Sequence, residues 1–131
     1  MKKILIYLPL ILAMMVLSSC KKEDAAKDLQ KVIDKINYFN TTFEGFYSDG
    51  VISTEKPDDD TPSEYEKLKE IASQYYDMMN KINSNIADEK DDLDDGQTIG
   101  EYEQQYIDLL SQRNAEIIEI TTLFEDNLSK M

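Results

Sequence analysis

Residues 24–47 read DAAKDLQKVIDKINYFNTTFEGFY, and this stretch decides the fold. Its apolar residues recur in two rows with a spacing of seven, which are Leu29, Ile36 and Phe43, and Ala25, Val32, Phe39 and Phe46. A spacing of seven keeps side chains on one face of an α-helix, where they pack against other helices. Ile33 and Tyr47 widen this face beyond a two-stranded seam. The stretch therefore predicts a helix over about 24–47 that has more than one neighbour.

A second helix is predicted over about 62–93. Its two apolar rows are Tyr65, Ala72, Met79, Ile86 and Leu93, and Leu68, Tyr75 and Ile82. Thr61 precedes Pro62, and Glu64 follows at the spacing of a capping box, in which Thr and Glu side chains accept bonds from free N–H groups. Thr61 is therefore the predicted cap.

A third helix is predicted over about 99–128, with Thr98 and Glu101 as a second capping box. Its inner face carries Ile99, Tyr102, Tyr106, Leu109, Leu110, Ile117, Ile120, Phe124 and Leu128. The tight turn around Gly96 makes the second and third helices antiparallel, whereas residues 48–61 form a longer linker. We expect an all-α domain over 25–131, a three-helix up-down-up bundle with coiled-coil-like heptad packing. A long hairpin that completes its core as a homodimer is the alternative, because a heptad pattern does not determine how many chains supply the packed helices.

The charge of the chain is strongly acidic, with 27 Asp and Glu against 14 Lys and Arg. Such a surface repels nucleic acid and anionic headgroups, and attracts divalent cations or a basic protein. The chain has no His, which is the commonest general base near neutral pH and the commonest transition-metal ligand. It also has only four Gly, and no Gly-rich phosphate loop. We therefore expect neither an enzyme nor a cofactor.

The first twenty residues have the pattern of an export signal. Lys2 and Lys3 precede an apolar run over 4–17, which is too short to cross the roughly 30 Å hydrocarbon core. Leu17-Ser18-Ser19-Cys20 follows, and Cys20 is the only cysteine. This sequence resembles the lipobox of bacterial lipoproteins, in which Leu and two small residues precede the acylated Cys.

The resemblance implies that residues 1–19 are removed and that Cys20 carries the lipid, with 20–24 as a tether. The mature chain then has 12 basic and 27 acidic residues, a net charge of −15. No thiol is left for a disulfide or for catalysis. The implied location is a bacterial cell envelope, at the outer membrane, with the protein facing the periplasm or the exterior. Lys21-Lys22-Glu23-Asp24 resembles the signal for the outer face in some Bacteroidetes lipoproteins.

Arg113 is the only arginine, and it falls between Leu110 and Ile117 in an apolar row. A buried guanidinium needs a carboxylate partner, because leaving it unpaired is costly. Folding the chain about Gly96 brings Arg113 opposite Asp77, which is the predicted partner in a structural ion pair; Glu44 is the second choice.

The acidic stretch 88–96 suggests calcium, since hard cations prefer clustered carboxylates. Aligning Gly96 with the invariant glycine of an EF-hand places Leu93 and Tyr102 at ligand positions, so the motif fails and no metal site is predicted. Tyr38 and Tyr76 fall off the apolar rows and are the expected surface tyrosines. Together these observations predict a lipid-anchored envelope protein with a structural or protein-binding role. The alternative is an inhibitor or immunity protein that binds a cationic secreted enzyme or toxin.

Overall fold

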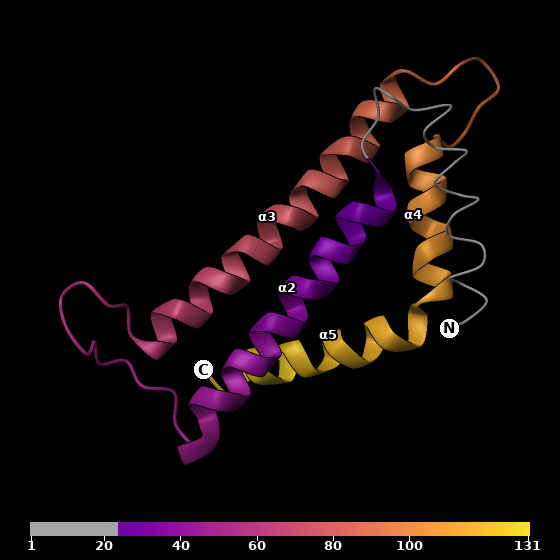
Figure 1. Cartoon of the computed structure of the whole chain (residues 1–131). Coiled ribbons are helices and arrows are strands. Elements are labelled where there is room, and N and C mark those ends of the chain that lie inside the picture. Colours follow the sequence, from indigo (N-terminus) through magenta and orange to yellow (C-terminus); the bar gives the residue numbers. More distant parts are fainter. Residues whose placement is uncertain (1–23) are drawn as a thin grey trace.

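The computed structural model describes residues 24–131, so the signal segment and Cys20 lie outside the described residues. The described part is all-helical, as predicted, and contains no strand. Its α-helices are α2 (Ala25–Phe46), α3 (Glu64–Asp91), α4 (Glu101–Gln112) and α5 (Asn114–Ser129), with a short 3-10 helix η1 (Tyr47–Asp49) after α2. Helices α2 and α3 run antiparallel, and α4 returns beside both of them (Figure 1).

The starts of α2 and α3 follow local capping chemistry. Asp24 caps α2, because its side chain accepts the N–H groups of Ala26 and Lys27. The cap of α3 is Ser63, two residues beyond the predicted Thr61. Ser63 Oγ accepts the N–H of Glu66 at 3.1 Å and donates to the Glu66 carboxylate at 3.3 Å.

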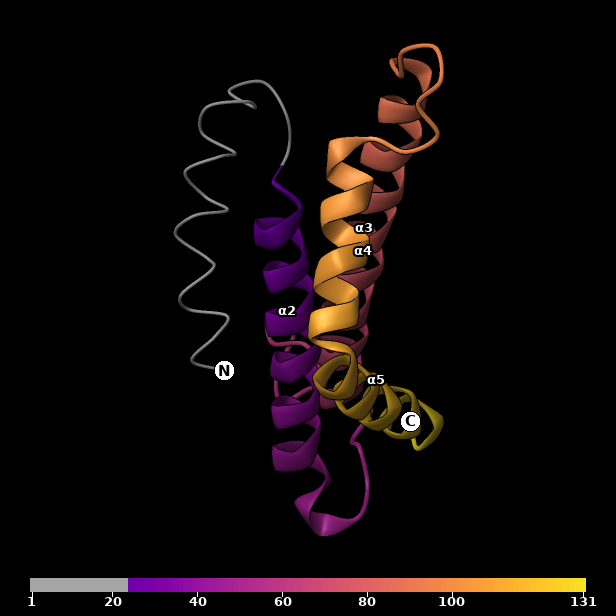
Figure 2. The ribbon, with the colours of Figure 1, turned by 90° about the vertical axis from the view of Figure 1, so that its right-hand side faces the viewer.

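The expected third helix is two helices, α4 and α5, that meet at an elbow at Arg113. Figure 2 shows α5 turning away from the axis of α4. Arg113 has φ −109° and ψ 18°, and neither Gly nor Pro lies near it. The bend is therefore made by tertiary contacts. Phe124 packs edge-on against Phe39 of α2, with ring centroids 4.7 Å apart. This contact holds α5 across the C-terminal half of α2.

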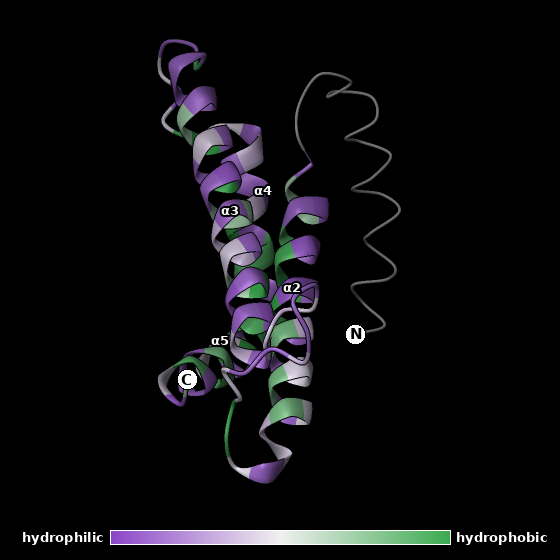
Figure 3. Ribbon diagram, turned by 90° about the vertical axis from the view of Figure 1, so that its left-hand side faces the viewer, coloured by the Kyte–Doolittle hydropathy of each residue, from purple (hydrophilic) through white to green (hydrophobic). Residues whose placement is uncertain are grey.

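The core lies along α2, whose predicted apolar face is buried. Phe39, Ile36 and Ile33 are at most 2% exposed. Helix α3 contributes Leu68, Ile71, Ala72 and Ile82 to the buried core, the linker contributes Ile52, α4 contributes Tyr102 and α5 contributes Phe124. Figure 3 shows hydrophobic colour on the facing sides of the helices and hydrophilic colour outside. Because α2 contacts α3, α4 and α5, it is the central element of the fold.

Between residues 24 and 131, none of the helices combines the length and the apolar composition that a membrane span requires.

Candidate functional site

A buried carboxylate lies near the start of α2. Asp28 is only 7% exposed, and its Oδ2 accepts a 2.7 Å hydrogen bond from the Tyr102 hydroxyl of α4. Asn85 of α3 donates to the same oxygen at 3.4 Å. Three helices therefore meet at one acceptor, which fixes their register at this end. Tyr102 was predicted on the inner face of its helix, whereas Asp28 was not predicted as a site residue.

The start of α4 is capped by another helix. The Glu89 carboxylate of α3 accepts the N–H groups of Tyr102 at 3.0 Å and Glu103 at 3.2 Å. An anion here also stabilises the positive end of the helix dipole. Gly100 makes room for it, since a Cβ at this position would overlap the Glu89 carboxyl group. The predicted capping box of Thr98 and Glu101 is thus replaced by a longer-range contact.

An acidic pocket of about 370 Å³ opens beside this cap, between the end of α3 and the start of α4. Half of its ten lining residues are acidic, namely Asp88, Glu89, Asp92, Asp94 and Glu101, and none is basic. No group of three or more His, Cys, Asp and Glu within 24–131 is arranged to hold a metal ion. The five acidic side chains make the pocket a concave negative surface.

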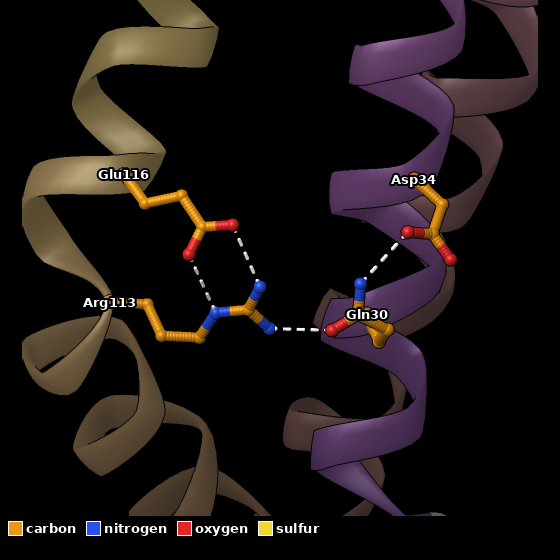
Figure 4. Close-up of polar contacts among 4 residues, drawn as sticks. All are labelled: Gln30, Asp34, Arg113 and Glu116. Carbon is orange, nitrogen blue, oxygen red and sulfur yellow. Dashed lines mark hydrogen bonds and ion pairs between the residues drawn. The ribbon is translucent and has the colours of Figure 1, made fainter. Parts of the chain in front are cut away.

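Arg113 has a different partner from the one predicted. Its Nε and Nη2 donate to the two carboxylate oxygens of Glu116 at 3.1 and 2.8 Å, and its Nη1 donates to Gln30 Oε1 at 2.7 Å (Figure 4). Asp77 is exposed on α3, whereas Arg113 closes α4 on the side that faces α2. The predicted ion pair Arg113–Asp77 is therefore replaced by Arg113–Glu116, and the bond from Arg113 to Gln30 links the start of α5 to α2.

Aromatic side chains join α3 to α5. Tyr75 lies 4.9 Å from Phe124 and 5.0 Å from Tyr76, measured between ring centroids. Tyr76 is 52% exposed and Tyr38 is 49% exposed, which confirms both as surface tyrosines. Burial raises the pKa of Tyr75, and the nearby Tyr76, Tyr106 and Glu125 raise it further. Burial also raises the pKa of Tyr106.

These raised pKa values predict a loss of stability in alkali. In the folded protein Tyr75 and Tyr106 hold their protons above pH 10, where they ionise in the unfolded chain. Their contribution to stability is complete below about pH 10 and is lost as the pH rises through the folded pKa values. We expect a late component in an ultraviolet titration of tyrosine that Tyr75→Phe and Tyr106→Phe each reduce and that urea abolishes. A single-step titration in the folded protein would contradict this expectation.

A second pocket, of about 330 Å³, lies at the opposite end of α2, and we call it the distal pocket. Its apolar wall consists of Phe43, Tyr47 and Leu123. Its buried polar wall consists of Asn40 and Asn127, in which Asn127 Nδ2 donates to Asn40 Oδ1 at 3.2 Å. Leu123 is 48% exposed beside these amides. An apolar surface with a few fixed polar groups is typical of binding sites.

Comparison with known proteins supplies no family for this chain. No protein-family model matches the chain, and no curated protein or solved structure matches it either.

Proposed function

We propose that this protein is a lipid-anchored component of a bacterial cell envelope, and that its helical domain, residues 25–131, has a structural or protein-binding role without catalysis. The observation that carries the proposal is Leu17-Ser18-Ser19-Cys20 directly after the apolar run 4–17. All four positions fit the lipobox pattern. Two or more acyl chains hold a protein firmly in a bilayer, so lipid on Cys20 would supply the anchor.

The arrangement of the helices gives the anchored protein two distinct ends. Asp24 lies only four positions after Cys20, and four extended steps of the chain span at most about 14 Å. Lipid on Cys20 would thus hold the start of α2 near the bilayer, at the end of the molecule where α3 ends and α4 begins (Figure 1). The acidic pocket lies at this end. Helix α2 has 22 residues. At 1.5 Å per residue, it would place the distal pocket about 33 Å further out.

The distal pocket is the contact surface that this orientation favours. It lies at the end that points away from the anchor, and it combines an apolar wall with the buried amides Asn40 and Asn127. The end that carries the acidic pocket is charged instead of apolar, and its carboxylates repel anionic headgroups. A partner protein would accordingly approach the half of the domain formed by the end of α2 and by α5.

Replacing Cys20 by Ala should abolish anchoring. We expect cells that express the full-length chain to incorporate labelled palmitate into it and to retain it in the membrane fraction. The Cys20→Ala variant should incorporate no label, since Cys20 is the only cysteine. Ser19→Ala is the matched control and should be labelled normally, because Ala is also small. Label that persists in Cys20→Ala would overturn the proposed anchor.

A second candidate function is inhibition of a cationic enzyme or toxin, and the acidic pocket is the observation that favours it. Five carboxylates line this pocket without a basic neighbour among its lining residues. A basic loop would gain electrostatic attraction there, and its association would be fast at low salt. The net charge of −15 that follows removal of residues 1–19 would strengthen the attraction.

Neutralising the pocket tests this second function. We expect a basic partner, captured from native envelopes by crosslinking, to be lost when Asp88, Asp92 and Asp94 are all changed to Asn. Changing Asp58, Asp59 and Asp60 of the linker to Asn removes the same charge elsewhere and should leave capture intact. Equal capture by both triple variants, or capture that does not fall as salt is raised, would contradict a role for the pocket.

A further inference from the structure

The apolar pattern of the chain continues through the elbow between α4 and α5. One row is Leu110, Ile117 and Phe124; the row beside it, Arg113, Ile120 and Asn127, contains one apolar residue and two polar ones. Both rows keep the spacing of seven across the bend at Arg113. The sequence of this region is therefore that of one amphipathic helix, although the structure divides it in two.

Backbone bonding at the elbow is still close to that of a helix. The Arg113 N–H donates to the Leu109 carbonyl at 3.0 Å, and the Ile117 N–H donates to the Arg113 carbonyl at 2.9 Å. Both are bonds between residues four apart. Residues 111–115 are Ser, Gln, Arg, Asn and Ala, all of which an α-helix accepts. A straight helix from Glu101 to Ser129 is consequently accessible to this chain.

The hydrogen bonds and the backbone packing that hold α5 in its bent position lie on α2, while Phe124 also packs against Tyr75 of α3. Phe124 packs against Phe39, Asn127 donates to Asn40, and Asn40 Nδ2 donates to the Ile120 carbonyl at 3.1 Å. No backbone contact joins α5 to α3 within the described residues. The α2 surface around Phe39 and Asn40 is thus shaped for α5, and the α5 of any copy of this chain presents the same groups.

We propose that the surface of α2 around Phe39 and Asn40 is a docking site for α5 of a second copy of the chain. In the dimer, α4 and α5 of each copy form one straight helix. Each α5 packs on the Phe39–Asn40 surface of the other copy's α2. Exchange of an identical element preserves every contact between α2 and α5, which makes it an accessible route to a dimer. Straightening also completes the helical bonding at Arg113. Repulsion between two acidic chains opposes the dimer, so salt favours it.

Crosslinking between two differently tagged, co-expressed chains detects the exchange. Glu44 of α2 and Leu123 of α5 line the same distal pocket, so thiols at these positions are close only where an α5 covers an α2. One full-length chain carries Glu44→Cys and the other carries Leu123→Cys. Both also carry Cys20→Ala, which leaves each introduced thiol as the only one in its chain. We expect a short bis-maleimide to yield a product that contains both tags. Gln104→Cys, at an exposed position of α4, replaces Leu123→Cys in the control and should yield none.

The exposed Asn114 supplies a matched pair of variants, because it would lie inside the straight helix. Ala stabilises a helix interior more than Gly does, and this difference acts in both chains of the dimer. We expect the dimerisation constant obtained from the mixed-tag product to be about fifteen- to thirtyfold higher for Asn114→Ala than for Asn114→Gly. Equal yields would indicate a side-by-side contact instead of exchange and would overturn the proposal, as would the absence of mixed-tag product from Asn114→Ala.

Discussion

Replacing Phe39 by Ala is expected to lower the free energy of unfolding by about 3–5 kcal/mol, the range observed for buried Phe side chains. Phe39 is fully buried, and its ring contacts Phe124 of α5 and Phe43 of the same helix. Truncation to Ala would open a cavity at the point where α5 crosses α2. A loss of this size is a large part of the stability of a domain of about 110 residues.

Urea denaturation followed by far-ultraviolet circular dichroism measures this loss. Tyr38→Ala is the matched control, because it removes an aromatic ring from the adjacent residue, which is 49% exposed. We expect the control to cost less than about 1 kcal/mol. Similar losses for the two variants would mean that α2 does not present the face that the structure assigns to it.

Replacing Tyr102 by Phe should lower the free energy of unfolding by about 2–3 kcal/mol, although it removes a single oxygen atom. That oxygen donates a 2.7 Å hydrogen bond to Asp28, which is 7% exposed. Without it, the buried carboxylate keeps the longer, 3.4 Å bond from Asn85. Hydrogen bonds to charged groups are stronger than neutral ones, and a buried charge that loses a partner is destabilising.

A double-mutant cycle separates this bond from the packing of the ring. In an Asp28→Ala background, Tyr102→Phe should cost little, because the acceptor is already gone, so the two losses should not add. Tyr106→Phe removes the hydroxyl of the half-buried tyrosine on the next turn of α4 and should cost less than about 1 kcal/mol. Additive losses for Asp28 and Tyr102 would contradict the assigned hydrogen bond.

The positions of the helices could be predicted because they follow from local spacing. The first two predicted helices, 24–47 and 62–93, agree with α2 and α3 to within two residues at each end. Polar residues that fall inside the apolar face of α2 indicate buried polar contacts, and these contacts were not predicted. Asp28 lies three residues after Ala25, and Asn40 lies three before Phe43, so each falls on the inner face of α2. Their burial was therefore accessible to the same reasoning.

The elbow and the partner of Arg113 could not be predicted in the same way. Nothing in residues 109–117 breaks a helix, and the bend depends on contacts of Phe124 and Asn127 with residues more than eighty positions earlier in the chain. Once α5 turns across α2, Arg113 lies beside Gln30 and Glu116 rather than Asp77. The Glu89 cap on α4 likewise depends on tertiary placement, since it joins helices across an irregular loop.

We propose above all that lipid on Cys20 anchors the chain, and the mass of the mature N-terminal peptide tests this proposal most directly. Full-length protein would be expressed in a bacterium that processes lipoproteins, extracted from membranes, digested and analysed by mass spectrometry. We predict a peptide that begins at Cys20 and carries the added mass of acyl chains. A mature N-terminus at another residue, or an unmodified Cys20 in the membrane-extracted protein, would contradict it.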